Sequence, residues 1–124
     1  MSTPGRKIWA IAGGNIPFGS TGEEPDLTSR DELSILNASK RDAEVTITIY
    51  YSDRDPVAPY KVTVGAQRVR VIRFNDLIDP QPLPLAVPYA ALIESTRRVI
   101  VQFTRHDTRQ AENALISMMA FPVD

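Results

Sequence analysis

Apolar and polar residues alternate strictly over residues 43–51, and this pattern constrains the fold more than any other feature of the chain. Successive side chains of a β-strand point to opposite faces, so a period of two separates an apolar face from a polar one. The apolar face here collects Val45, Ile47, Ile49 and Tyr51. The segment therefore predicts a strand with one face turned toward a core.

Similar alternation appears on both sides of Gly65-Ala66, over residues 58–64 and 67–74. Two alternating segments joined by a short glycine-containing connection are typical of a β-hairpin, which we expect here. Further apolar runs, bounded by polar or proline-containing segments, also predict strands: residues 7–12, 32–38, 89–95 and 98–104. The chain thus carries about seven clear strand signals.

The last apolar segment, residues 112–121, is ambiguous because its alanine, leucine and methionine residues follow a helical spacing. We nevertheless expect a strand, since a lone terminal helix would need an exposed apolar sheet face, whereas an eighth strand completes two opposed sheets. Prolines concentrated over residues 80–88 predict an extended connection that crosses between the sheets. The expected fold is all-β, a β-sandwich of about eight strands forming a single domain over residues 1–124.

The composition excludes several classes of protein. The chain has no cysteine, so it has no disulfide, thiol nucleophile or thiolate metal site, and we expect a cytoplasmic location. The apolar stretch from Ile8 to Ala12 is too short for a signal-peptide core or a membrane span. A formal net charge of -1 lacks the basic excess that a general nucleic-acid binder carries.

Patterns that would indicate catalysis or metal binding are weak. His106 is the only histidine, which excludes a multi-histidine zinc site, and no Gly-x-Ser-x-Gly segment supplies an activated serine. The acidic residues over 23–32 do not match a calcium loop, so we expect a solvated acidic loop there. We therefore predict no enzyme activity, no catalytic residue, no metal and no cofactor. An enzyme acting through Asp107, Arg105 and His106 is the least supported alternative.

The densest group of polar side chains, residues 102–113, follows the end of an apolar run. Gln102 could contact the hydroxyl groups of a polyhydroxylated ligand, while Arg105 and Arg109 present bidentate donors to its oxygens. The alternative, which the residues alone favour, is that carboxylates such as Asp107 pair with these arginines on a solvated surface.

Aromatic residues offer a second kind of ligand contact. Alternation places Tyr51 and Tyr60 on the side of the aliphatic residues, where they are expected in the core. Trp9 and Tyr50 remain as side chains that could stack against a sugar ring or a base.

Two further polar groups have both a structural and a functional interpretation. Asn75 and Asp76 are good turn residues, and a purely structural turn is expected there. Arg68 and Arg70 share one face of a predicted strand. With Lys61, Arg97 and Arg98 nearby, they could form a basic stripe that contacts phosphate. A solvated strand face is the alternative.

Several of these segments resemble the sensory rhodopsin transducer family. The resemblance is carried by two long motifs, RFNDLIDP at residues 73–80 and VQFTRHDTRQAENAL at residues 101–115. Five shorter motifs precede them in order: WAIA at 9–12, GNIP at 14–17, ILNA at 35–38, ITIYYSD at 47–53 and PVAPY at 56–60.

The resemblance implies a jellyroll-like β-sandwich that assembles into a homotetramer and has a non-enzymatic signalling role. It further implies binding of a sugar-like small molecule. The alternative function that it implies is a transducer that is coupled to a membrane rhodopsin and binds DNA as a transcriptional regulator. The ligand-binding residues that it carries onto this chain are Trp9, Asn37, Tyr51, Asn75, Asp76, Gln102, Arg105, Asp107 and Arg109.

Overall fold

The computed structural model describes residues 3–16, 30–107 and 114–124. These residues form eight strands and one short 3-10 helix, η1 (Phe74–Asp76), and they contain no α-helix. The strands are β1 (Arg6–Gly14), β2 (Arg30–Asn37), β3 (Ala43–Tyr51), β4 (Val57–Val64), β5 (Arg68–Arg73), β6 (Tyr89–Asp107), β7 (Ala114–Met119) and β8 (Phe121–Pro122). The all-β sandwich is confirmed.

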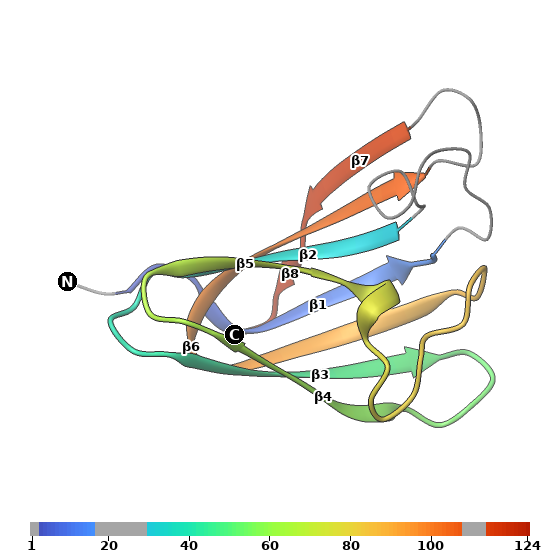
Figure 1. The fold of residues 1–124 in the computed structure, drawn as a ribbon, viewed down its shortest axis with the longest axis horizontal. Helices are drawn as coiled ribbons and strands as arrows, with labels where there is room; N and C mark the ends of the chain where they lie inside the picture. Colours follow the sequence, from blue (N-terminus) through green and yellow to red (C-terminus); the bar gives the residue numbers. More distant parts are fainter. Residues whose placement is uncertain (1–2, 17–29, 108–113) are drawn as a thin grey trace.

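The strands are arranged in two antiparallel sheets that share β6. The first sheet has the order β4-β3-β6-β1-β8, and in the second β6 lies between β2 and β7, with β5 on the outer side of β2. In Figure 1, β2, β5 and β7 lie above β3 and β4. Inward-facing aliphatic side chains of both sheets form one continuous core, in which Val45, Ile47 and Ile49 are at most 1% exposed.

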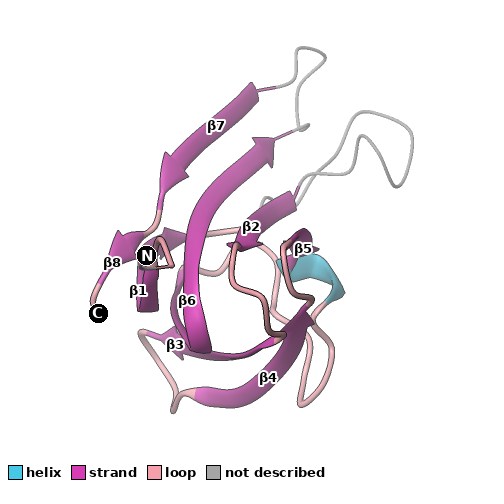
Figure 2. Ribbon diagram, turned by 90° about the vertical axis from the view of Figure 1, so that its left-hand side faces the viewer, coloured by secondary structure: helices cyan, strands magenta, loops and turns pink. Residues whose placement is uncertain are grey.

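β6 is a single strand where the sequence predicted two, over residues 89–95 and 98–104. Its first part pairs with β1 and β3, and its last part pairs with β2 and β7. Between them the strand bulges, because Arg6 pairs with Val99 while Ile8 pairs with Glu94. Figure 2 shows β6 curving from one sheet into the other. The polar residues 95–98 interrupt the apolar pattern without ending the strand.

The predicted hairpin over residues 58–74 is wrong. β4 pairs with β3 in the first sheet, whereas β5 pairs with β2 in the second, so the connection between them crosses from sheet to sheet. Gln67 turns the chain with a φ of 53°, and its N–H donates to the carbonyl of Ser39. Alternation describes the faces of each strand, but it does not identify the strand that lies beside it.

The last apolar segment forms β7 and β8, which confirms a strand in place of the helix that its spacing favours. The extended conformation is favoured over a helix because β7 pairs with β6 in the second sheet and β8 pairs with β1 in the first. The proline-rich connection after η1 leads from β5 in the second sheet to the first part of β6 in the first sheet. It therefore crosses between the sheets, as predicted.

Candidate functional site

A buried carboxylate lies where the two sheets meet. Asp31, at the start of β2, has no exposed surface. Its Oδ2 accepts hydrogen bonds from the backbone N–H of Asn15 at 2.9 Å and the hydroxyl of Tyr89 at 2.8 Å. Its Oδ1 accepts one from Nε of Arg105 at 3.0 Å, which forms an ion pair. The buried charge is therefore compensated by both a cation and hydrogen bonds.

The course of β6 brings these groups together. Tyr89 begins β6 and Arg105 lies near its end, yet both contact Asp31, because the bulged strand bends and returns toward the same end of the sandwich. Arg105 also donates from Nη2 to the carbonyl of Gly13 at 2.8 Å, which ties the end of β1 into the same network. The Arg105 side chain therefore connects β6 to β2 by an ion pair and to β1 by a hydrogen bond.

The Tyr89 side chain is fixed by its surroundings. Its ring packs against Phe74 with a centroid distance of 5.1 Å and an interplanar angle of 55°. A Cβ atom at Gly14 would lie 2.3 Å from the ring, so a side chain at this position has no room. Burial, and then the neighbouring charge of Asp31, raise the pKa of the Tyr89 hydroxyl, which stays protonated as a donor.

This network corrects the prediction of a solvated acidic loop over residues 23–32. Residues 23–29 lie outside the described part of the chain, but Asp31 is fully buried and Glu32 forms an ion pair with Arg30. The sequence contained one usable signal. Asp31 has the same parity as Leu33 and Ile35, so the strand turns all three toward the core.

Two of the predicted ligand-binding residues are buried and bonded to the backbone. The indole N–H of Trp9, a residue 5% exposed, donates to the carbonyls of Arg6 and Val99. Asn37 has no exposed surface, and its amide donates to the carbonyls of Arg41 and Val64. Both side chains connect segments that are distant in sequence, and neither presents its polar group to solvent.

The other predicted residues are spread over the molecule. Asn75 and Asp76 form η1, where the expected turn is present and Asp76 lies 3.5 Å from Arg73. Gln102 is exposed on β6. Asp107 ends β6, but its side chain, like the whole of Arg109, lies outside the described residues. Arg105 is held by Asp31 rather than by a neighbour in sequence.

Tyr51 lies beside a shallow hollow of about 230 Å³, which is lined by residues of β1, β3 and the start of β6. The lining includes Tyr50, which is 41% exposed, Ser52 and Pro88. Tyr51 is half-buried, and the guanidinium of Arg54 lies 4.8 Å from its ring centroid. Burial raises the pKa of the Tyr51 hydroxyl, an effect that Arg54 partly offsets. The hollow is therefore lined by the aromatic rings of Tyr50 and Tyr51 together with the hydroxyl of Ser52.

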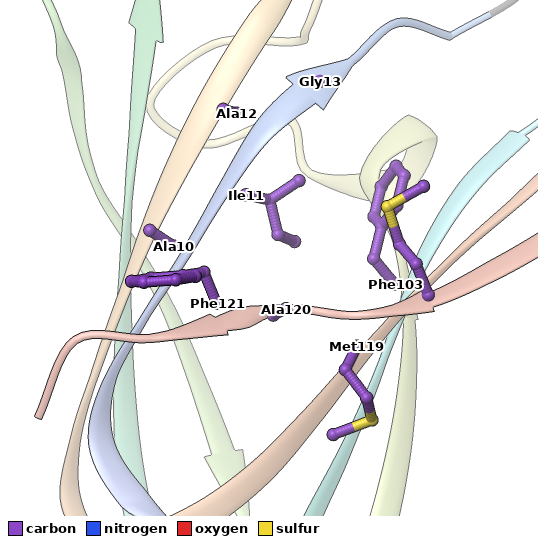
Figure 3. A pocket seen from close by; sticks show the side chains of 9 residues that line it. Ala10, Ile11, Ala12, Gly13, Phe103, Met119, Ala120 and Phe121 are labelled. Carbon is purple, nitrogen blue, oxygen red and sulfur yellow. The ribbon is translucent and has the colours of Figure 1, made fainter.

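A second hollow, of about 240 Å³, is apolar and lies between β1 and the end of the chain. Figure 3 shows Ile11, Phe103, Met119 and Phe121 around it. None of its lining residues carries a charge. This hollow therefore suits an apolar group better than a polyhydroxylated one.

The described residues contain neither a cluster of metal ligands nor a helix that could span a membrane. They contain no group of three or more histidine, aspartate or glutamate side chains placed to hold a metal ion. Within the same residues, no helix is long and apolar enough to cross a membrane.

A family profile and one solved structure identify the same family. The profile of the family described as Anabaena sensory rhodopsin transducer matches residues 4–122. Among solved structures, an Anabaena sensory rhodopsin transducer is 44% identical with a TM-score of 0.72, covering 84% of this chain and 100% of that one. A Thermotoga maritima protein, reported as the crystal structure of Thermotoga maritima 1070, is 26% identical with a TM-score of 0.83, covering 95% of each chain.

No curated protein matched the chain. The profile match spans nearly the whole sequence, and the Anabaena structure is similar over its full length. The resemblance first seen in the two long motifs, residues 73–80 and 101–115, therefore extends to the whole sandwich. The chain belongs to the Anabaena sensory rhodopsin transducer family.

Proposed function

We propose that this protein is a non-enzymatic signalling protein that works in the cytoplasm and transmits the state of a membrane sensory rhodopsin. The observation that carries the proposal is the family match over residues 4–122, together with 44% identity to a protein named as a sensory rhodopsin transducer.

The buried network supports a binding role over a catalytic one. Arg105, which an enzyme acting through Asp107, Arg105 and His106 would require, already donates to Asp31 and to the carbonyl of Gly13. Its position is thus explained by the connection between the sheets. A rigid sandwich that exposes several distinct surfaces suits a protein that works by contact.

The decisive experiment measures binding to the sensory rhodopsin encoded in the same genome, embedded in lipid nanodiscs. We expect binding whose affinity differs between dark and illuminated receptor, because a transducer must distinguish the two states of its partner. Nanodiscs without rhodopsin are the control. Equal binding in both states, no binding in either, or a genome without such a receptor would contradict the proposal.

A second candidate function is recognition of a sugar-like small molecule at the hollow beside Tyr51. Its support is the exposed ring of Tyr50, which can stack on the apolar face of a sugar, next to the hydroxyl of Ser52. Calorimetric titration with a panel of sugars should reveal a binder that Tyr50→Ala removes. Val69→Ala, at another exposed side chain, should leave binding unchanged. A panel without any binder would contradict this candidate.

DNA binding is the alternative role, and its support is the exposure of Arg68 and Arg70 on the edge strand β5. A contact made through phosphates weakens steeply as salt rises, because bound counterions are released. We therefore expect duplex DNA to bind at low salt and to dissociate at higher salt, as measured by fluorescence anisotropy. Affinity that does not change with salt, or with Arg68→Gln, would count against this role.

A homotetramer is also part of the proposal. Its support is a row of exposed apolar side chains at the end of the chain, formed by Met118, Met119, Phe121 and Val123, which are 52–72% exposed. Apolar side chains gathered at a sheet edge are typical of surfaces that associate. β7 and β8 would then lie at the contact between subunits.

A further inference from the structure

A basic groove lies at the end of the sandwich away from Asp31. It consists of two adjoining hollows of about 570 and 310 Å³, which share Thr3, Ser39 and Arg97. Every charged side chain that lines either hollow is a cation: Lys7, Lys40, Arg41, Arg97 and Arg98. These side chains come from the start of the chain, from the connection after β2 and from β6.

The bulge in β6 positions the cations of this groove. Residues 95–98 face Lys7 of β1 without regular pairing, so Arg97 and Arg98 lie where the strand leaves the first sheet. Bulges redirect side chains in this way and occur often beside binding sites. Gly5 brings the start of the chain close, since it has a φ of 108° and a Cβ atom there would lie 2.2 Å from the Val99 carbonyl oxygen.

The cations of the groove have no ion-pair partner within the described part of the chain, and all five are exposed. Asp42 and Glu44, the acidic residues nearest in sequence to Arg41, accept hydrogen bonds from the N–H of Ala66 and the hydroxyl of Thr63. Glu94, three residues before Arg97, and Asp124, whose backbone bonds to that of Ile8, form no ion pair with the groove cations. Like charges kept together without partners repel one another, and a bound anion would relieve that repulsion.

We propose that the basic groove binds a small molecule with two or more phosphate groups. Five cations spread over two joined hollows match several negative charges better than one, and arginine forms paired hydrogen bonds with phosphate oxygens. The concave shape suits a compact ligand that enters the groove, whereas a membrane or a DNA duplex contacts protruding or extended surfaces. The site is independent of rhodopsin coupling and would give the protein a second, soluble input.

The test is calorimetric titration with sodium tripolyphosphate at low salt. We expect binding to the unaltered protein and a loss of about tenfold or more in R97Q/R98Q, because two charge-assisted contacts are removed. The matched control is R54E, which lowers the net charge by the same amount at an exposed position outside the groove and should change affinity by less than about twofold. Unchanged thermal unfolding of both variants shows that the fold is intact.

Two further titrations identify the source of the phosphate. Binding of tripolyphosphate that is not displaced by duplex DNA or by phosphatidylglycerol vesicles, and that is lost in R97Q/R98Q, supports the groove as the site of a small polyphosphate. Displacement by DNA or vesicles, or their binding without binding of tripolyphosphate, would overturn the proposal. So would equal losses of tripolyphosphate affinity in R97Q/R98Q and R54E, because general charge would then explain the effect.

Discussion

Asp31 is the residue whose environment most influences the candidate site. A carboxylate without exposed surface is costly unless hydrogen bonds and an opposite charge compensate it, and here Arg105, Tyr89 and the N–H of Asn15 do so. The arginine predicted to bind a ligand is therefore committed to the fold. Its loss should affect stability before it affects recognition.

Replacing Arg105 with glutamine should lower the free energy of unfolding by about 2–4 kcal/mol, because Asp31 loses its cation in a buried position. The matched control is Arg54→Gln, which breaks the exposed pair with Asp53 at the same distance of 3.0 Å and should leave stability unchanged. Urea denaturation of the two variants measures the difference. Equal effects would show that the Arg105 contact behaves like a surface pair.

Replacing Tyr89 with phenylalanine tests the raised pKa of its hydroxyl. At neutral pH the loss of the bond to Asp31 should cost about 1–2 kcal/mol of unfolding free energy. Above about pH 10 the unfolded tyrosine ionises while the folded one stays protonated, so the unaltered protein loses stability as pH rises. The difference in unfolding free energy between the unaltered protein and Tyr89→Phe should thus become smaller at alkaline pH. A difference that stays constant with pH would contradict the raised pKa of the Tyr89 hydroxyl.

At the scale of elements, β6 organises the molecule. Its first part belongs to one sheet and its last part to the other, and the bulge between them allows the strand to change sheets without ending. The basic groove lies at that bulge, and the Asp31 network lies where the two ends of the strand return. One strand thus positions the groups at both ends of the sandwich.

Alanine substitutions at Gly14 and Gly13, two neighbouring residues at the end of β1, test how tightly this strand packs against β6. Gly14→Ala should destabilise the protein by about 1–3 kcal/mol, because the new Cβ meets the ring of Tyr89, which its bond to Asp31 holds in place. Gly13→Ala should change stability by less than about 0.5 kcal/mol, because nothing lies within 4 Å of its Cβ. Thermal unfolding measures both, and similar effects would show that the ring moves aside.

At the scale of the whole molecule, the exposed surfaces differ in character. The basic groove lies at one end, an aromatic hollow lies beside Tyr51, and apolar side chains gather along β7 and β8. A chain with a formal net charge of -1 thus holds a concentrated positive region that its overall composition conceals. These separate surfaces give a signalling protein several places at which to bind partners.

The proposed homotetramer predicts a mass in solution of about four times 13.8 kDa, as measured by light scattering after gel filtration. Phe121→Glu should reduce that mass, because a charge would be buried in an apolar contact. Ile78→Glu is the control, since Ile78 is similarly exposed but lies after η1, away from β7 and β8. A monomeric unaltered protein, or equal dissociation of both variants, would contradict the proposed contact.

The sequence by itself determined where most strands lie, their buried faces and the turn at Asn75, because alternation and turn chemistry depend on neighbouring residues. It divided β6 into two strands, because residues 95–98 are polar. It did not determine which strand lies beside which, so the expected hairpin over residues 58–74 became a crossing between sheets. Nor could it pair Asp31 with Arg105, which are 74 residues apart, or gather the cations of the basic groove. Those contacts exist only after the sheets pack, because burial and close approach are properties of the folded chain.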